Sequence, residues 1–303
     1  MRVTGVMVES VGSKRRTLMA GMTLVLIAAP ASAFSASGRS QAPEGSNGQT
    51  SAAPAPPAGV TSVISPAPTL PIRIEPKAQL ILDRTLQALG GPAFLNAKTL
   101  TTHGRLFSIN EGAASAFVYF DSELQFPDKR RLSYGLGKKG KPITVINNGD
   151  LGWEIDRMGM VHLDSAEIRQ WRFGNRYSLE NLLRLRIREP GVLVQTAGVD
   201  FVDNVNVEIL DIVDAQQTEV KLYLNKQTDL PVKIRYRKWD PTINDWNEYS
   251  DVYSDYQTFQ GVVTPKRMTR SLNDRRISEV YRDSATYNEV YPAQLFMDPG
   301  APP

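Results

Sequence analysis

The chain has no cysteine and only two histidines, His103 and His162, among its 303 residues. The absence of cysteine excludes disulfides, thiolate metal sites and a lipid-modified cysteine at an export cleavage site. With only two histidines and no accompanying motif, few side chains are available for a metal site or a Ser/His/Asp triad. The Gly-x-Ser-x-Gly elbow and the glycine-rich phosphate loops are also missing. We therefore expect no catalytic residue, no metal and no cofactor, and we predict that the protein is not an enzyme.

The chain has little net charge once its beginning is set aside. It carries 35 basic and 32 acidic residues, which gives a formal charge of +3. Four of the basic and one of the acidic residues lie within residues 1–33, so that 31 of each sign remain. A balanced surface has no net positive field to attract nucleic acid. We therefore expect no nucleic-acid partner.

The first 33 residues have the order of parts typical of a signal peptide. A basic cluster, Lys14-Arg15-Arg16, is followed by an apolar run over residues 18–29 and by Ala31-Ser32-Ala33. This run is shorter than the roughly 20 apolar residues of a membrane-spanning helix. We predict cleavage and a periplasmic location, with the general secretory route favoured over the twin-arginine route. An uncleaved N-terminal anchor is the alternative.

Residues 34–75 are rich in Ser, Ala, Pro and Gly and show no sustained apolar period. Such a segment cannot bury enough surface to offset the entropy lost on ordering. We therefore predict a disordered linker over residues 34–75 and one folded domain over residues 76–299.

The domain begins with a helical pattern and continues mainly with a period of two. Apolar spacing predicts a helix over residues 77–89, ended by Gly90-Gly91. Alternation predicts strands over residues 116–120, 205–210, 219–224 and 232–237, and the short connections favour antiparallel pairing. A second helical stretch, residues 165–187, is expected to divide at Gly174. Its arginines are expected on a solvated face, with a membrane surface as the alternative contact.

Several stretches, in order over residues 77–299, resemble outer-membrane lipoprotein-sorting (LolA-like) domains. The first is Leu89-Gly-Gly-Pro-Ala-Phe-Leu95, and the others lie within residues 198–204, 222–233, 253–265 and 287–296. The resemblance, to a superfamily of LolA- and LppX-type periplasmic lipid carriers, implies an incomplete antiparallel barrel with helices over its concave face. The element order agrees, because two apolar helical elements need a sheet to pack on. The predicted fold class is α+β, mainly β, with a curved antiparallel sheet.

The resemblance also implies a carrier of a hydrophobic ligand, such as the acyl chains of a lipid or lipoprotein, and leaves room for a membrane-protein partner. Burial of an acyl chain contributes about 0.8 kcal/mol per CH₂, so no catalytic group is needed. The side chains expected to line the site are apolar or aromatic: Phe94, Phe117, Tyr119, Trp153, Trp171, Leu182, Leu183 and Tyr236. The alternative for each of them is an ordinary place in the core.

Two other functions remain open. The same fold with a closed core would be a non-catalytic protein-interaction module, with Trp239 and Trp246 as aromatic anchors. An exported hydrolase is the third alternative, and its chemistry would have to use His103 or His162.

Overall fold

The computed structural model describes residues 70–110, 112–137 and 141–300. The predicted signal peptide and the predicted linker up to residue 69 lie outside the described residues. The expected end of that linker, residue 75, is too late. Arg73 and Ile74 form a short strand, β1, which pairs in parallel with Leu193 and Val194. No helix in the described part of the chain is long and apolar enough to cross a membrane.

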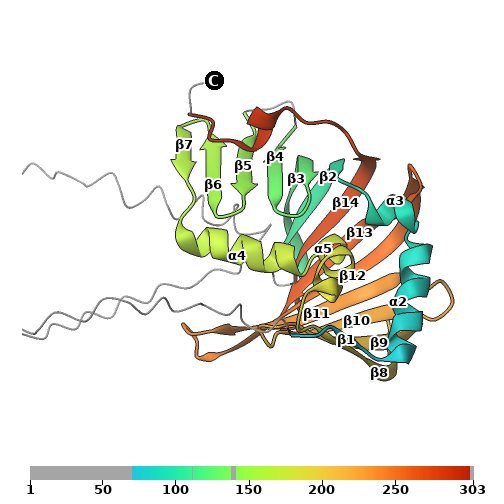
Figure 1. The fold of residues 1–303 in the computed structure, drawn as a ribbon. Coiled ribbons are helices and arrows are strands. Elements are labelled where there is room, and N and C mark those ends of the chain that lie inside the picture. The colour runs from blue at the N-terminus through green and yellow to red at the C-terminus, as the bar shows by residue number, and fades with distance from the viewer. Residues whose placement is uncertain (1–69, 111, 138–140, 301–303) are drawn as a thin grey trace, which may run out of the picture.

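In the described part of the chain, fourteen strands form one continuous sheet in the order β1-β8-β9-β10-β11-β12-β13-β14-β2-β3-β4-β5-β6-β7. Their bounds are β1 (Arg73–Ile74), β2 (Thr99–Asn110), β3 (Ala113–Gln125), β4 (Lys129–Gly135), β5 (Ile143–Asn148), β6 (Leu151–Asp156), β7 (Gly159–His162), β8 (Leu193–Val202), β9 (Val205–Val213), β10 (Glu219–Asn225), β11 (Pro231–Asp240), β12 (Asp245–Phe259), β13 (Val262–Leu272) and β14 (Arg275–Tyr287). The end strands β1 and β7 do not pair with each other, so the curved sheet is an incomplete barrel (Figure 1). The predicted fold class is confirmed.

Alternating burial explains which side of each strand faces inward. In β11, Ile234 and Tyr236 are buried, whereas the side chain of Arg237 is exposed to solvent. Residues opposite each other in adjacent strands share a face of the sheet. The inner face therefore continues from Tyr236 to Tyr249 of β12. This concave face is the surface on which the helices pack.

The helical elements other than η3 lie along the open side of the sheet in Figure 1. They are α2 (Pro76–Ala88), α3 (Pro92–Leu95), α4 (Ser165–Arg176), α5 (Leu179–Arg184), and the short 3₁₀ turns η2 (Arg186–Arg188) and η3 (Ala293–Phe296). The helix predicted over residues 77–89 is confirmed as α2, whose inward side buries Ile81, Leu82 and Leu86. Asp164 begins α4 through a reciprocal pair of bonds with Glu167, the capping box.

The second helical stretch divides at a different place from the one predicted. Gly174 lies inside α4, and the break falls at Tyr177 and Ser178. The Ser178 Oγ accepts a hydrogen bond from the Asn181 amide and so begins α5. Tyr177, next to the break, is buried and donates to Asp214. Tertiary packing of Tyr177, rather than the helix propensity of Gly174, sets the break.

The expected solvated face of arginines is also partly wrong. Arg176 forms ion pairs with Glu189 and with the buried Asp214. Arg184 donates hydrogen bonds to the carbonyl oxygens of Leu95 and Ala97. These two guanidinium groups therefore hold the helices against the rest of the fold. They are not available as a membrane-binding stripe.

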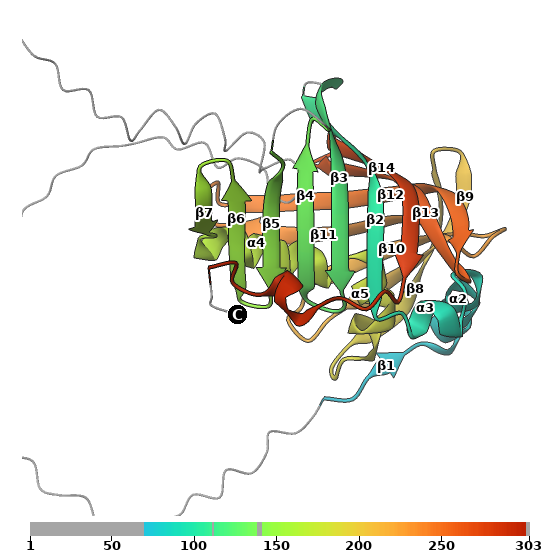
Figure 2. The ribbon, with the colours of Figure 1, turned by 90° about the horizontal axis from the view of Figure 1, so that it is seen from above.

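The described part of the chain has two main apolar clusters and a small third one of Val207, Ile209 and Tyr223. The larger one joins α2, α5 and the strands β8–β14, and the smaller one lies on β2–β5 with Val280 of β14. The C-terminal segment covers part of the opposite face. Figure 2 shows it passing the ends of β3 to β6, and η3 contacts β4 and β5. Both faces of this part of the sheet are thus partly covered.

Candidate functional site

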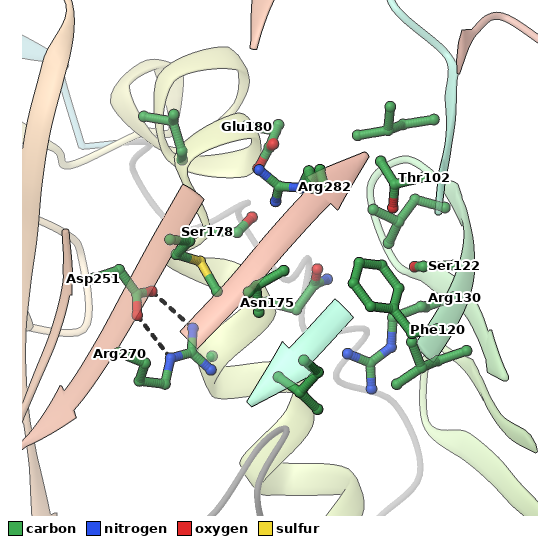
Figure 3. Close-up of a pocket in the computed structure, with 18 of the residues that line it drawn as sticks. Thr102, Phe120, Ser122, Arg130, Asn175, Ser178, Glu180, Asp251, Arg270 and Arg282 are labelled. Atoms are coloured by element: carbon green, nitrogen blue, oxygen red, sulfur yellow. Dashed lines mark hydrogen bonds and ion pairs between the residues drawn. The ribbon is translucent and has the colours of Figure 1, made fainter. Parts of the chain in front are cut away.

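A pocket of about 180 Å³ lies between the concave face of the sheet and helices α4 and α5. Figure 3 shows its lining residues converging from strands on both sides of the pocket and from the helices. The strands contribute an apolar wall of Leu100, Leu106, Phe120, Leu132, Met268 and Val280. The helices contribute Trp171, Gly174, Asn175, Ser178, Leu179 and Glu180. The pocket joins the two apolar clusters at the point where the helices bridge the sheet.

The helices that close this pocket are held with unequal firmness. In α5, Leu179, Asn181, Leu182 and Leu183 are all buried. In α4, Trp171 is the buried residue, and most of the helix is half-buried or exposed. Burial of apolar surface is the main force that holds a helix on a sheet. The structure therefore makes α4 the more weakly held side of the pocket.

The pocket also has a polar part on its sheet side. Thr102 and Ser122 lie directly opposite each other in β2 and β3 and both line the pocket. Three guanidinium groups, from Arg130, Arg270 and Arg282, line it as well. The site thus combines an apolar wall with a group of hydrogen-bond donors. This combination is typical of pockets that orient a ligand with one polar end.

Arg270 is neutralised within the site by Asp251. Its Nε and Nη2 donate to the two carboxylate oxygens of Asp251 at 2.7 Å each (Figure 3). Burial alone would lower the pKa of Arg270, but the adjacent carboxylate outweighs burial and raises it. Bidentate geometry of this kind favours a stable buried pair. Arg270 and Asp251 therefore form a fixed part of the wall.

Arg130 has no such partner. Its Nη2 donates to the Asn147 Oδ1 at 3.0 Å, and its guanidinium carbon lies 6.0 Å from the Trp171 ring centroid. In the described part of the chain no carboxylate lies within ion-pair distance of it. Burial, with a smaller contribution from the charge of Arg270, lowers the pKa of Arg130 to about 10. The group therefore keeps its charge at neutral pH.

The eight residues predicted to line a ligand site fall in three places. Trp171 lines the pocket. Phe94, Leu182, Leu183 and Tyr236 are buried in the larger apolar cluster, away from the pocket lining. The surroundings of these four side chains are those of ordinary core residues, the stated alternative.

Phe117, Tyr119 and Trp153 lie on the wrong face for the predicted site. Phe117 and Tyr119 are 45% and 49% exposed on the convex side of β3. Trp153 is buried, but it lies opposite Ile146 on the convex face, with its ring centroid 6.1 Å from that of His162. The stretch 116–120 is apolar at nearly every position, so its alternation does not reveal which face is inward.

The sequence interpretation missed the charged residues of the pocket, although a signal for them exists. Arg130 precedes Leu132 and Tyr134 at a spacing of two, and both of these are buried. Asp251 stands between Tyr249 and Tyr253 in the same way. A charged side chain in phase with buried neighbours must face the interior.

A second pocket, of about 520 Å³, opens beside the first. Lys98, Gln125, Arg184 and Val290 are among the residues that line it. Phe126 borders both pockets, and the guanidinium carbon of Arg184 lies 4.4 Å from its ring centroid. The side chain of Phe126 thus stands between the two spaces.

The two histidines lie outside both pockets. The His103 Nδ1 is 2.5 Å from the Asp121 Oδ1, on the exposed convex face. Among the described residues no group of three or more His, Cys, Asp or Glu side chains could hold a metal ion.

Comparison with known sequences finds no matching family model and no matching curated protein. Solved structures are similar to this chain at low identity. A LolA superfamily protein from Nitrosomonas europaea is 13% identical, with 73% of this chain and 97% of that chain covered and a TM-score of 0.46. An outer membrane lipoprotein-sorting protein domain from Vibrio parahaemolyticus is 11% identical, with coverage of 72% and 97% and a TM-score of 0.48.

A protein of the family DUF1329 from Desulfovibrio piger is 10% identical, with coverage of 76% and 98% and a TM-score of 0.49. Structures of the superfamily that the sequence resembles are thus among those similar to this chain. All three TM-scores lie below 0.5. The function is therefore inferred from the pocket and not from these structures.

Proposed function

We propose that the protein is a non-catalytic carrier, which binds the acyl chain of a lipid or lipoprotein in the pocket between the concave sheet and helices α4 and α5. One observation carries this proposal: an apolar space remains between the sheet and the helices. Leu106, Leu132 and Val280 form its sheet side, and Trp171 closes it from the helix side. A closed core would fill such a space, because protein interiors pack with few voids.

The volume limits what the pocket holds in this conformation. About 180 Å³ is close to the engineered cavity of about 150 Å³ that binds benzene, and below the roughly 300 Å³ of the smallest common ligand pockets. A short apolar segment fits as the pocket stands. A long acyl chain requires α4 to move away from the sheet, and α4 buries one residue against four in α5.

The proposed location is the periplasm, after cleavage behind residue 33. The basic cluster, apolar run and Ala-Ser-Ala segment at the start of the chain support this. The linker of residues 34–69 would then precede the folded domain. An apolar pocket suits a protein that takes a lipid from one membrane surface and delivers it to another, with a membrane protein as partner.

Solvent extraction and mass spectrometry of the purified protein test the proposal. The protein is exported to the periplasm of a bacterial host and purified without detergent. We expect acyl lipids to co-purify in a substoichiometric but reproducible amount. Added lipid should raise the thermal midpoint of unfolding, because a ligand that binds only the folded state stabilises it. A lipid-free protein whose stability no lipid changes contradicts the proposal.

A second candidate function is supported by the exposed tryptophans of the β11–β12 hairpin. Trp239 and Trp246 are 42% and 54% exposed, and their ring centroids lie 5.5 Å apart. Exposed tryptophans are enriched among residues that dominate binding energy at protein interfaces. If the protein is an interaction module, Trp239→Ala and Trp246→Ala should abolish capture of a protein partner and leave the pocket's lipid binding unchanged. Unchanged capture counts against this candidate.

A further inference from the structure

The charges around the pocket do not balance. Its lining contains the guanidinium groups of Arg130, Arg270 and Arg282 and the carboxylates of Glu180 and Asp251. The charge of Asp251 is balanced by its ion pair with Arg270. Glu180 and Arg282 both act electrostatically on Tyr256 and Tyr287, so their opposite charges lie in the same part of the pocket. The excess positive charge is therefore located at Arg130.

Arg130 is held in place from both sides. It stands on the inner face of β4, opposite Leu124 of β3 and Asn147 of β5. The Asn147 amide oxygen accepts its Nη2 hydrogen at 3.0 Å, and the Trp171 ring stands 6.0 Å from its guanidinium carbon. The position of this guanidinium group is thus fixed before any ligand arrives.

Two donors at this point have no partner. The Arg130 Nε and the Asn147 Nδ2 are buried and make no hydrogen bond to the described residues. Because the Asn147 oxygen already faces Arg130, turning the amide around would put its NH₂ group against the guanidinium group. A buried donor without a partner destabilises the folded state, and more so when it is charged. An acceptor oxygen from outside the chain would lower this cost at Arg130, which lines the pocket, whereas Asn147 does not.

The remaining surface of Arg130 faces the pocket, which explains why the residue is only half-buried by area although its surroundings lower its pKa. Ser122, on the adjacent strand β3, is the diagonal neighbour of Arg130, and Thr102 of β2 lies opposite Ser122. Both residues are buried and line the pocket. Next to them begins the apolar wall.

We propose that the pocket selects amphipathic ligands with an anionic oxygen head group, a carboxylate or a phosphate, which binds Arg130 while the chain packs between Leu132, Trp171 and Val280. This inference rests on the proposed function, since it assigns the polar end of the same ligand. The head group supplies the counter-charge that Arg130 lacks. Thr102 and Ser122 donate to its further oxygens.

Equilibrium binding of four probes with the same chain length tests the inference. The probes are dodecanoate, dodecyl phosphate, dodecanol and dodecyltrimethylammonium, each below its micelle concentration. Hydrogen bonds to a charged group are worth about 1.5–3 kcal/mol, so we expect the two anions to bind about tenfold to a hundredfold more tightly than dodecanol. The stronger of the two anions identifies the head-group class. The cationic probe should bind most weakly.

Two variants locate the selectivity. Arg130→Met should bring the anions to the affinity of dodecanol, whereas Arg130→Lys should retain part of the preference. Arg131→Met is the matched control, because Arg131 faces outward and contacts Glu123 at 3.8 Å. It should leave all four affinities unchanged. The comparison of probes on the unaltered protein stands even if a variant does not fold.

The outcomes separate this inference from the proposed function. Equal binding of dodecanol and both anions overturns the head-group inference and leaves the carrier function standing. The same conclusion follows if Arg130→Met keeps the full preference for anions. If none of the four probes binds, the carrier function itself fails, and the inference fails with it.

Discussion

Gly174 is the residue at which the pocket can be filled with least disturbance. It lies in the interior of α4, one helical turn after Trp171, so both residues face the sheet. A Cβ atom placed there meets no other atom within 4 Å. Glycine inside a helix also costs about 1 kcal/mol relative to alanine. A larger residue at this position therefore enters the pocket without straining the helix.

We predict that Gly174→Leu lowers lipid binding at least tenfold while the protein remains as stable as before or becomes slightly more stable. Gly174→Ala is the matched control, and it should gain about 1 kcal/mol of stability and keep its affinity. Isothermal titration with dodecanoate and urea unfolding measure the two effects. Unchanged affinity in Gly174→Leu would place the ligand elsewhere.

Asp214 is the residue that ties the junction of α4 and α5 to the sheet. It is 2% exposed and accepts hydrogen bonds from Tyr177 Oη at 2.7 Å and from Arg176 Nη2 at 3.1 Å. It also accepts from the backbone amides of Gln216 and Thr218. The side chain thus connects the helices to the turn between β9 and β10.

We predict that Asp214→Ala lowers the free energy of unfolding by about 3–5 kcal/mol, because it leaves the Tyr177 hydroxyl and the Gln216 and Thr218 amides without their acceptor. Arg176 keeps its ion pair with Glu189. Asp283→Ala removes a carboxylate of a mostly exposed pair with Arg105 and should cost less than about 1 kcal/mol. Urea denaturation of both variants makes the comparison. Equal losses would show that the Asp214 cluster does not hold the fold together.

At the scale of elements, α4 and α5 differ in how much they bury. Only Trp171 of α4 is buried, against four residues of α5. Local opening requires little free energy where few apolar contacts are lost. We predict that the amides of α4 exchange with deuterium faster than those of α5, and that bound dodecanoate slows α4 selectively. Equal exchange in both helices, unaffected by lipid, would contradict a movable α4.

The C-terminal segment packs against the sheet through Phe296 of η3. Phe296 of η3 is 2% exposed, with its ring centroid 5.6 Å from that of Tyr291, and its carbonyl oxygen accepts from Asn148 of β5. We predict that Phe296→Ala costs about 3–5 kcal/mol of stability, as truncation of a buried phenylalanine does. Val290→Ala, at a position 97% exposed, should stay within about 0.5 kcal/mol. Thermal and urea unfolding of the two variants decide whether the segment is part of the folded domain.

Sequence patterns were sufficient for elements with one apolar and one polar face. In α2 and β11 the period identified both the element and its inward side. The pattern was insufficient for residues 116–120, where both faces carry apolar side chains and the phase is undetermined. It also failed at Trp153, which is buried on the convex face, the side along which the C-terminal segment runs. The burial of Trp153 on that face depends on tertiary packing, which the alternation within β6 does not record.

The candidate site was less predictable than the fold for a related reason. Apolar residues were expected to define it, and Trp171 alone of the eight lines the pocket. The distinguishing residues are charged, and composition places charged residues outside. Arg130 and Asp251 are interior because each is in phase with the buried residues of its own strand. The position of the helices over the sheet, which creates the pocket, depends on tertiary contacts such as that of Tyr177 with Asp214.

The whole molecule combines a curved open sheet, a weakly held helix α4 and a pocket with one charged end. The sheet supplies a concave surface that its own strands cannot close. Helices α4 and α5 complete the enclosure, and Arg130 marks its polar end. A carrier needs these features together, because the ligand must enter, be retained and leave without reaction.

The most direct test is an NMR measurement of contacts between ¹³C-labelled dodecanoate and the protein. The account predicts intermolecular NOEs from the chain to the Trp171 ring and the Met268 methyl group, both of which line the pocket. It predicts none to Phe117 or Tyr119, which lie on the convex face. NOEs confined to those convex residues, or to the Trp239 and Trp246 hairpin, would contradict the claim that this pocket is the lipid site.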